Sequence, residues 1–394
     1  MELVNSIQEV IGRHYWDTGL GYNFAHLQVL LLLTNSFRST DPRDKVFALL
    51  GLSSSGQSPE NWPDELAPDY TRLVQDMYAA TAKYCIRQTE SLSLLSQFVY
   101  DKSPPHLRFP SWIPRWDLGN STRRISAFSL YWGPHRTRHL LEKFNQASKG
   151  TRVTMDHDAP LRILRVLGMQ VDTINICLPT VILDHAKFHA GVPERYGEYL
   201  SKLIPQLYIM SKKYVHQISR SFDQTFFLVT TAGLTREQGD ARSEPRRRYE
   251  FIANLAEEWT KVQSAPGDAA AASSASTLLL TQCSDESPSH RQCRHEPDGI
   301  HRSACYPNRY IFSLQRLMNR RLFVTSSGHL GLGPAGMMSG DIVAILFGGN
   351  VPYILRPLVN KQWHFVGECY LDGYMDGEAM EGRGSSRDEW FEMV

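Results

Sequence analysis

Between residues 2 and 262, apolar side chains recur in several stretches at every third or fourth position, which is typical of helices with one buried face. Two apolar runs, 161–167 and 169–176, instead indicate strands, with Gly168 as a bulge or bend between them. Pro205 would interrupt or kink one helix. The predicted helices are 2–13, 24–37, 42–50, 71–88, 194–218 and 247–262.

The helix over 42–50 has boundary signals at both ends. Asp41 is suited to accept hydrogen bonds from the first backbone amides, and Pro42 fits the first helical position. Gly51 fits the left-handed residue that ends many helices. Thr71 is the matching N-terminal cap for the next helix. The segment 226–231 is left open between a short strand and a buried helical turn.

After a predicted helix over 310–318, the apolar period changes to two. Short alternating segments separated by Gly and Asn are typical of a small barrel or sandwich. The expected fold class is therefore α+β: a mainly helical N-terminal body with a few strands, followed by a small antiparallel β-barrel-like C-terminal unit. The strand candidates are 321–325, 330–332, 341–347, 353–357, 363–367 and 370–374.

Composition divides the chain further, because residues 264–306 form an Ala/Ser tract and a polar stretch that differ from everything around them. We interpret this segment as a low-complexity, disordered insertion. The resulting division is a helical region 1–117, a mixed α/β region 118–263, the insertion 264–306, a small β-rich unit 307–380 and a tail 381–394.

The net charge and the apolar runs argue against nucleic-acid and membrane partners. The 394 residues carry 42 Lys+Arg and 41 Asp+Glu, so no net field draws the chain to nucleic acid. No apolar run approaches the ~20 residues of a membrane span, and no secretory signal is visible. Six cysteines are too few for a disulfide scaffold. We expect free thiols and a cytoplasmic protein, with the nucleus as the alternative.

The segment Gly331-Leu332-Gly333-Pro334-Ala335-Gly336 matches the G-x-G-x-x-G pattern of dinucleotide-binding loops. That chemistry needs a following helix, whereas a strand pattern follows here. We interpret Gly331, Gly333 and Asp341 as residues that shape β-turns, and we expect no cofactor.

Potential metal ligands gather in the insertion. Cys283, Cys293, His295 and Cys305 are the candidates, but they lack the paired spacing of a zinc finger. We therefore expect no metal, and we leave a zinc-linked interaction module as an open alternative.

Catalytic residues are not identifiable from the sequence. No nucleophile elbow, phosphate-binding loop, metalloprotease helix or kinase motif is present. An acidic C-terminal cluster could act as an acid/base pair or a cation site, but we favour its interpretation as hairpin-turn and rim residues. Its members are Glu368, Asp372, Asp376 and Glu378.

A proline-aromatic loop over 109–117 holds Trp112 and Trp116. An exposed tryptophan pair would be a plausible partner-binding surface, whereas buried rings would belong to the core. We favour burial and keep the pair, with the start of the 42–50 helix, as candidate interaction residues. These candidates are Asp41, Arg43, Asp44, Lys45, Trp112 and Trp116.

Four blocks together resemble the heterokaryon-incompatibility (HET-domain) proteins of filamentous fungi. They are TDPRDKVFALLGL at 40–52, PDYT at 68–71, FPSWIPRW at 109–116, and a series from RRLF at 320 to MDGE at 375–378. In that family the HET domain precedes such blocks, and none of its signature segments is present here. The resemblance implies that this chain corresponds to the C-terminal region alone, as a shortened relative or an incomplete gene model.

The resemblance implies a fungal regulatory or recognition protein that takes part in non-self recognition and cell death. It also implies that this protein is non-catalytic, because the HET domain is missing. It also implies a protein partner, while the oligomeric state stays open. The alternative hypothesis is an enzyme or accessory protein of a fungal secondary-metabolite gene cluster, whose aromatic side chains line a pocket.

Overall fold

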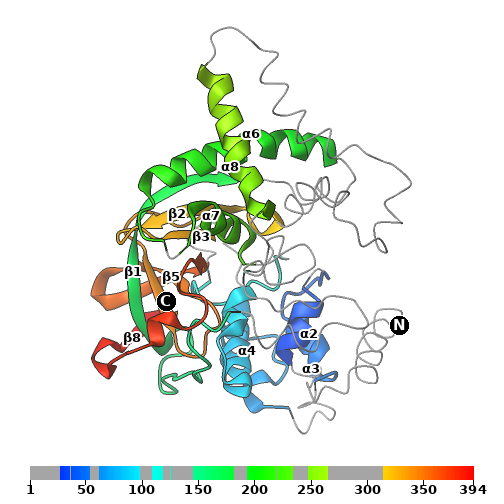
Figure 1. Cartoon of the computed structure of the whole chain (residues 1–394). Coiled ribbons are helices and arrows are strands. Elements are labelled where there is room, and N and C mark those ends of the chain that lie inside the picture. The colour runs from blue at the N-terminus through cyan, green and yellow to red at the C-terminus, as the bar shows by residue number, and fades with distance from the viewer. Residues whose placement is uncertain are drawn as a thin grey trace, which may run out of the picture. The chain divides into compact units, whose positions relative to one another are not determined.

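The computed structural model describes residues 27–35, 37–53, 62–97, 109–118, 125, 145–181, 193–218, 220–233, 247–264 and 314–394. The chain forms two compact units (Figure 1). The described residues of unit 1 come from 1–171, 340–368 and 374–394, and those of unit 2 come from 172–339 and 369–373. The predicted helix over 2–13 and nearly all of the 264–306 insertion lie outside the described residues.

The N-terminal part of unit 1 is helical, as its apolar spacing predicts. Helices α2 and α3 pack against each other, and α4 carries a buried face along most of its length. The helical elements are α2 (Leu27–Leu33), α3 (Asp44–Leu50), η2 (Asp64–Leu66), α4 (Val74–Thr89) and η3 (Ser93–Gln97).

The helix boundaries differ from the sequence-based expectation. Helix α3 begins at Asp44, because Asp41 and Pro42 form a preceding turn rather than its first residues. Gly51 has φ −66°, so the expected left-handed ending at this glycine is wrong. Helix α4 begins after Leu73, whose backbone is extended, so Thr71 does not cap it.

Unit 1 also contains a closed barrel of five strands, which confirms the predicted combination of N-terminal helices and a C-terminal barrel. The order is β4-β5-β6-β8-β1, and pairing of β1 with β4 closes the ring. One pairing, β6 with β8, is parallel, whereas β4–β5, β5–β6 and β8–β1 are antiparallel. The strands are β1 (Leu164–Val181), β4 (Ile342–Leu346), β5 (Tyr353–Pro357), β6 (Gln362–Glu368) and β8 (Glu389–Met393).

Strand β1 is continuous, so the expected break at Gly168 is wrong. A Cβ at Gly168 would lie 2.6 Å from the carbonyl oxygen of Ile345 and 3.0 Å from Cα of Leu346. The glycine is therefore required by the close approach of β4, whose backbone leaves no room for a side chain.

Unit 2 combines a small sheet with helices. The later residues of β1 pair with β2 (Arg320–Thr325), which pairs with β3 (Leu330–Pro334), and β3 pairs with β7 (Tyr370–Leu371). Helix α7 contacts β3 and α6 contacts β2 (Figure 1). The helical elements are α6 (Pro193–Tyr214), α7 (Phe222–Thr231), α8 (Arg247–Ser264) and η8 (Leu314–Arg316).

Two predictions are resolved in unit 2. Helix α6 continues on both sides of Pro205. The apolar segment 226–231 is part of α7, a helix with a buried second half, rather than a strand. In the described part of the expected 310–318 helix, only the 3₁₀ turn η8 is helical.

Gly331 and Gly333 lie within strand β3, so the expectation that they shape β-turns is wrong. A Cβ on Gly331 would lie 2.3 Å from the ring of Phe323 and 2.8 Å from the carbonyl oxygen of Tyr370, so this glycine permits close packing. No helix follows the G-x-G-x-x-G segment, because the next element is β4. The local structure therefore lacks the helix N-terminus that a dinucleotide phosphate requires.

Asp341 has a different role from the expected turn residue. It is 1% exposed and accepts two hydrogen bonds from the Arg356 guanidinium, at 2.8 and 2.9 Å. Three short 3₁₀ turns complete unit 1: η9 (Val359–Lys361), η10 (Glu378–Met380) and η11 (Ser385–Arg387). Among the helices the structure describes, none combines the length and apolar character needed to cross a bilayer.

Candidate functional site

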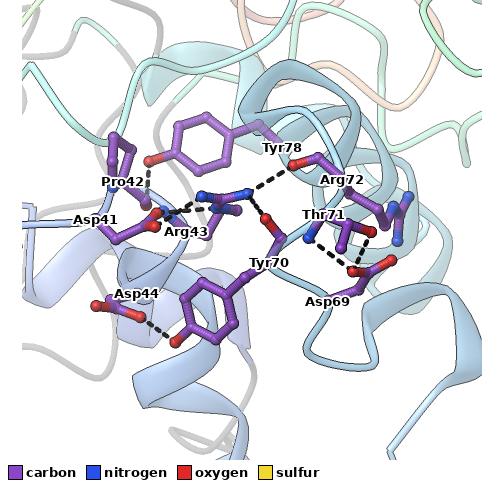
Figure 2. A network of polar contacts seen from close by, with 9 residues as sticks. All are labelled: Asp41, Pro42, Arg43, Asp44, Asp69, Tyr70, Thr71, Arg72 and Tyr78. Atoms are coloured by element: carbon purple, nitrogen blue, oxygen red, sulfur yellow. Dashed lines mark hydrogen bonds and ion pairs between the residues drawn. The ribbon is translucent and has the colours of Figure 1, made fainter.

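The segment that starts α3 folds on itself through Asp41 and Arg43 (Figure 2). Oδ1 of Asp41 accepts from the Arg43 backbone amide and from its Nε, each at 2.9 Å, and Oδ2 accepts from Nη2 at 2.8 Å. The side-chain bond from Arg43 is the largest of the effects that lower the pKa of Asp41. Two polar side chains thus fix the turn before α3 begins.

The same guanidinium reaches a second segment of the chain. Nη1 of Arg43 donates to the carbonyl oxygen of Tyr70 and, at 2.9 Å, to that of Arg72. The guanidinium carbon also lies 5.3 Å from the centre of the Tyr70 ring, in cation–π geometry. Arg43 therefore connects the block at 40–52 to the block at 68–71.

Two tyrosine hydroxyls strengthen this connection (Figure 2). The Tyr70 hydroxyl donates to Oδ1 of Asp44, and this bond is the largest cause of the raised pKa of Tyr70. The Tyr78 hydroxyl donates to the carbonyl oxygen of Pro42 at 2.7 Å, and burial raises the pKa of Tyr78. Both phenols therefore stay protonated and act as donors.

Asp69 organises the second block locally. Its Oδ1 accepts from the backbone amide of Thr71 at 2.8 Å and from the Thr71 hydroxyl at 2.6 Å, and the side-chain bond is the first cause of its lowered pKa. The amide and hydroxyl of Thr71 are therefore bonded within this turn, and Thr71 does not cap the following helix.

Lys45, in the first turn of α3, is buried. Its Nζ donates to the carbonyl oxygens of Thr34 at 3.1 Å, of Asn35 at 3.4 Å and of Phe37. Burial lowers the pKa of Lys45. Lys45 is 7% exposed, so the expectation that it contributes to an exposed interaction surface is wrong.

Trp112 and Trp116 are core residues, with exposed fractions of 0% and 2%. The Trp112 indole donates to the carbonyl oxygen of Arg162 at 3.0 Å, and that of Trp116 to Oε1 of Gln97 at 3.2 Å. Tyr78 packs edge-on against Trp116, with 4.9 Å between ring centres. Of the two interpretations weighed from the sequence, the structure supports burial, and an exposed tryptophan pair is excluded.

The acidic C-terminal residues are divided between the two units and have different hydrogen-bond partners. Glu368 is buried in unit 1, where it accepts from the backbone amide of Ile125. Asp372 belongs to unit 2, where it accepts from the Thr225 hydroxyl at 3.1 Å. Oε2 of Glu378 accepts from the backbone amide of Asp376 at 2.7 Å.

Within the described ranges, no three His, Cys, Asp or Glu side chains are grouped to hold a metal ion. The metal candidates Cys283, Cys293, His295 and Cys305 lie outside those ranges. The network in Figure 2 uses its polar groups to join two chain segments, so its evident chemistry is structural.

Sequence reasoning missed Tyr70 and Tyr78 as partners of the 41–45 segment. The DPRDK and PDYT blocks both belong to the same family resemblance, and this was the one indication in the sequence that they act together. Pairing two distant segments requires the tertiary fold, because Arg43 and the Tyr70 carbonyl are 27 positions apart in the chain.

The barrel strands β4, β5, β6 and β8 and the sheet strands β2, β3 and β7 all lie between residues 320 and 393. A family profile described as the Het-6 beta-barrel domain matches residues 242–392, and these strands fill its C-terminal half. Residues 242–392 are therefore similar to this barrel domain. The expected likeness to the C-terminal region of heterokaryon-incompatibility proteins is thereby confirmed.

One relative carries a name of the same kind. The chain is 35% identical over 83 residues to "Heterokaryon incompatibility protein 6, OR allele" of Neurospora crassa. The match covers 20% of this chain and 12% of the relative, so it spans about an eighth of that protein's length. No solved structure matches the chain significantly.

Proposed function

We propose that this protein is a heterokaryon-incompatibility-type regulatory or recognition protein that acts by binding a protein partner. The observation that carries the proposal is the Het-6 beta-barrel match over residues 242–392. The local identity to heterokaryon incompatibility protein 6 supports the same assignment. Non-self recognition linked to cell death, without catalysis, is the specific activity proposed.

The architecture is compatible with a binding role. Within the barrel, β4 is buried at all five of its positions. The motif residues Asp41 and Arg43 satisfy one another and neighbouring carbonyl groups. These features support a scaffold that presents a surface.

The experiment compares a deletion strain, the wild type and complemented strains of the fungus that carries the gene. Pairing each with several tester strains should show a changed barrage reaction on deletion, and overexpression should arrest growth. Complementation uses two variants, Gly168→Val, whose side chain would strike the β4 backbone, and Gly51→Ala, which meets no atom within 4 Å.

The expected result is that Gly51→Ala restores the wild-type reaction and Gly168→Val does not. Identical barrage behaviour and growth in the deletion and wild-type strains across all testers would contradict the proposed function. An altered secondary-metabolite profile with unaltered barrages would favour the biosynthetic hypothesis instead.

A further inference from the structure

Helix α6 of unit 2 has one buried face and one exposed face along its described length. Buried side chains recur at helical spacing on one face, and solvent-exposed side chains follow the opposite face, as expected of an amphipathic helix. The buried residues include Ile204, Leu207, Tyr208 and Ser211. The exposed face is formed by Lys202, Gln206, Ile209, Met210 and Lys213.

The middle of this exposed face is apolar. Ile209 is 41% exposed and Met210 is 38% exposed. The contacts of α6 with α7 use the other face, where the centre of the Tyr208 ring lies 5.0 Å from that of Phe222 and 5.3 Å from that of Phe226. Two adjacent large apolar side chains therefore stay at the surface of a helix whose opposite face is packed.

Lysines accompany these apolar side chains, and carboxylates do not, since residues 201–217 contain no Asp or Glu. Nζ of Lys212 lies 5.5 Å from the centre of the Tyr208 ring, and Nζ of Lys213 lies 5.3 Å from the centre of the Tyr214 ring. Neither lysine forms an ion pair with a carboxylate among the described residues. Lysines in a last turn also stabilise the C-terminus of a helix, but that effect does not explain the apolar pair beside them.

Helix α8, which packs against α6, shows what an ordinary solvated face looks like in the same unit. Its exposed residues in the described range are all polar, and Lys261 forms an ion pair with Glu258 at 2.8 Å. They are Asn254, Glu257, Glu258, Thr260 and Lys261. The exposed face of α6 differs in both respects, because it has an apolar centre and lysines without carboxylate partners.

We propose that the exposed face of α6 binds the protein partner, and that the bound segment of this partner is an acidic amphipathic helix. This inference rests on the proposed function, which requires a protein partner. Ile209 and Met210 pack against apolar side chains of the partner helix, and the flexible thioether of Met210 adapts to their shape. Carboxylates towards the two ends of that helix pair with Lys202 and Lys213.

The positions of the two lysines set the length of the partner segment. Lys202 and Lys213 are eleven positions apart, which is about 16 Å along a helix axis. A helix of about three turns spans that distance when it lies along α6. The expected segment therefore has Asp or Glu near both ends and apolar residues at every third or fourth position between them.

An anionic membrane would match the charge of this face but not its apolar content. Helices that lie in a membrane interface bury a broad apolar face among the lipids. In the described part of α6, the apolar centre of the exposed face is limited to Ile209 and Met210. These observations favour a protein segment over a lipid surface.

The test is photo-cross-linking of the full chain in the fungus that carries the gene, in colonies paired with tester strains. A benzophenone amino acid replaces Gln206 on α6 or, as the control, Asn254 on the exposed face of α8. Irradiation should give a protein adduct from position 206 and none from position 254, and mass spectrometry should map the adduct to an acidic segment.

Charge reversal then tests the role of the lysines. In the chain that carries the cross-linker at position 206, Lys213→Glu should reduce the adduct about tenfold or more, because like charges then face each other across the interface. The matched reversal on α8, Lys261→Glu, should leave the adduct unchanged. Lys213→Gln serves if Lys213→Glu is unfolded by circular dichroism, and it should also reduce the adduct.

Several results would overturn the inference: no protein adduct from position 206, an adduct to lipid or to a basic segment, or an adduct that the Lys213 variants leave undiminished. The proposed function fails separately, if deletion of the gene leaves barrages and growth unaltered. Barrages that depend on the gene but proceed normally with Lys213→Glu would contradict the α6 surface alone.

Discussion

At the scale of single residues, two charged side chains of the α3 region stabilise the backbone by donating to carbonyl oxygens. Arg43 donates to two carbonyl oxygens of a distant segment, and Lys45 donates to three carbonyl oxygens before α3. From the sequence alone, charged residues at the start of a helix are equally consistent with a solvent-exposed surface. The sequence singled out Arg43 and Lys45 as candidate residues. It did not show that Lys45 is buried, because burial depends on the segments that pack over a side chain.

Replacing Lys45 by Met tests this structural role. The variant keeps the apolar stem but leaves three carbonyl oxygens without their donor, so we expect a loss of about 2 kcal/mol in the free energy of unfolding. Urea denaturation followed by tryptophan fluorescence measures it, because Trp112 and Trp116 lie in the core of the same unit.

The control is Lys261→Met on α8, where the ammonium makes one exposed ion pair with Glu258 at 2.8 Å. That variant should leave the free energy of unfolding nearly unchanged, because solvent screens an exposed ion pair. Equal effects of the two substitutions would contradict a structural role for Lys45.

At the scale of elements, periodicity located most helices and strands, and tertiary contacts set their ends. The apolar runs on both sides of Gly168 were recognisable as strand, but their continuity was not. A glycine inside a strand pattern indicates a bulge or a close approach, and only the neighbouring β4 distinguishes the two. Likewise, Gly51 looked like a helix end, but its φ of −66° needs no glycine.

Gly168→Val should destabilise the barrel, because the nearest atoms to its new Cβ are backbone atoms of Ile345 and Leu346. We expect a loss of about 1–3 kcal/mol, typical of overpacking, in a thermal or chemical denaturation experiment. Gly51→Ala is the matched control: it should be neutral or stabilising by up to about 1 kcal/mol. A fully stable Gly168→Val variant would show that β1 and β4 can separate without cost.

At the scale of the whole molecule, the chain returns to unit 1 after unit 2, since residues 340–368 and 374–394 rejoin the N-terminal part. Strand β1 contributes residues to both units, to the barrel through its pairing with β8 and to the small sheet through β2. Each compact unit therefore combines separate stretches of the sequence, because contacts rather than sequence order define a compact unit.

Cysteine labelling reports on the two units separately. Cys85 in unit 1 is buried, and burial raises the pKa of its thiol to about 12. Alkylation of the folded protein by iodoacetamide at pH 8, followed by mass spectrometry, should modify Cys85 roughly a thousandfold more slowly than an unperturbed thiol. In unit 2, half-buried Cys177 should react faster than buried Cys369. Rapid labelling of Cys85 at native pH would show that unit 1 opens readily.

The sequence by itself determined the α+β class, the alternating β-rich C-terminal region and the likeness to heterokaryon-incompatibility proteins, because periodicity and motif order are local properties of the chain. Tertiary structure decided the ring closure through β1 and β4, the burial of Trp112 and Trp116, and the joining of Arg43 to Tyr70. Each of these depends on contacts between distant segments, whose positions no local pattern encodes.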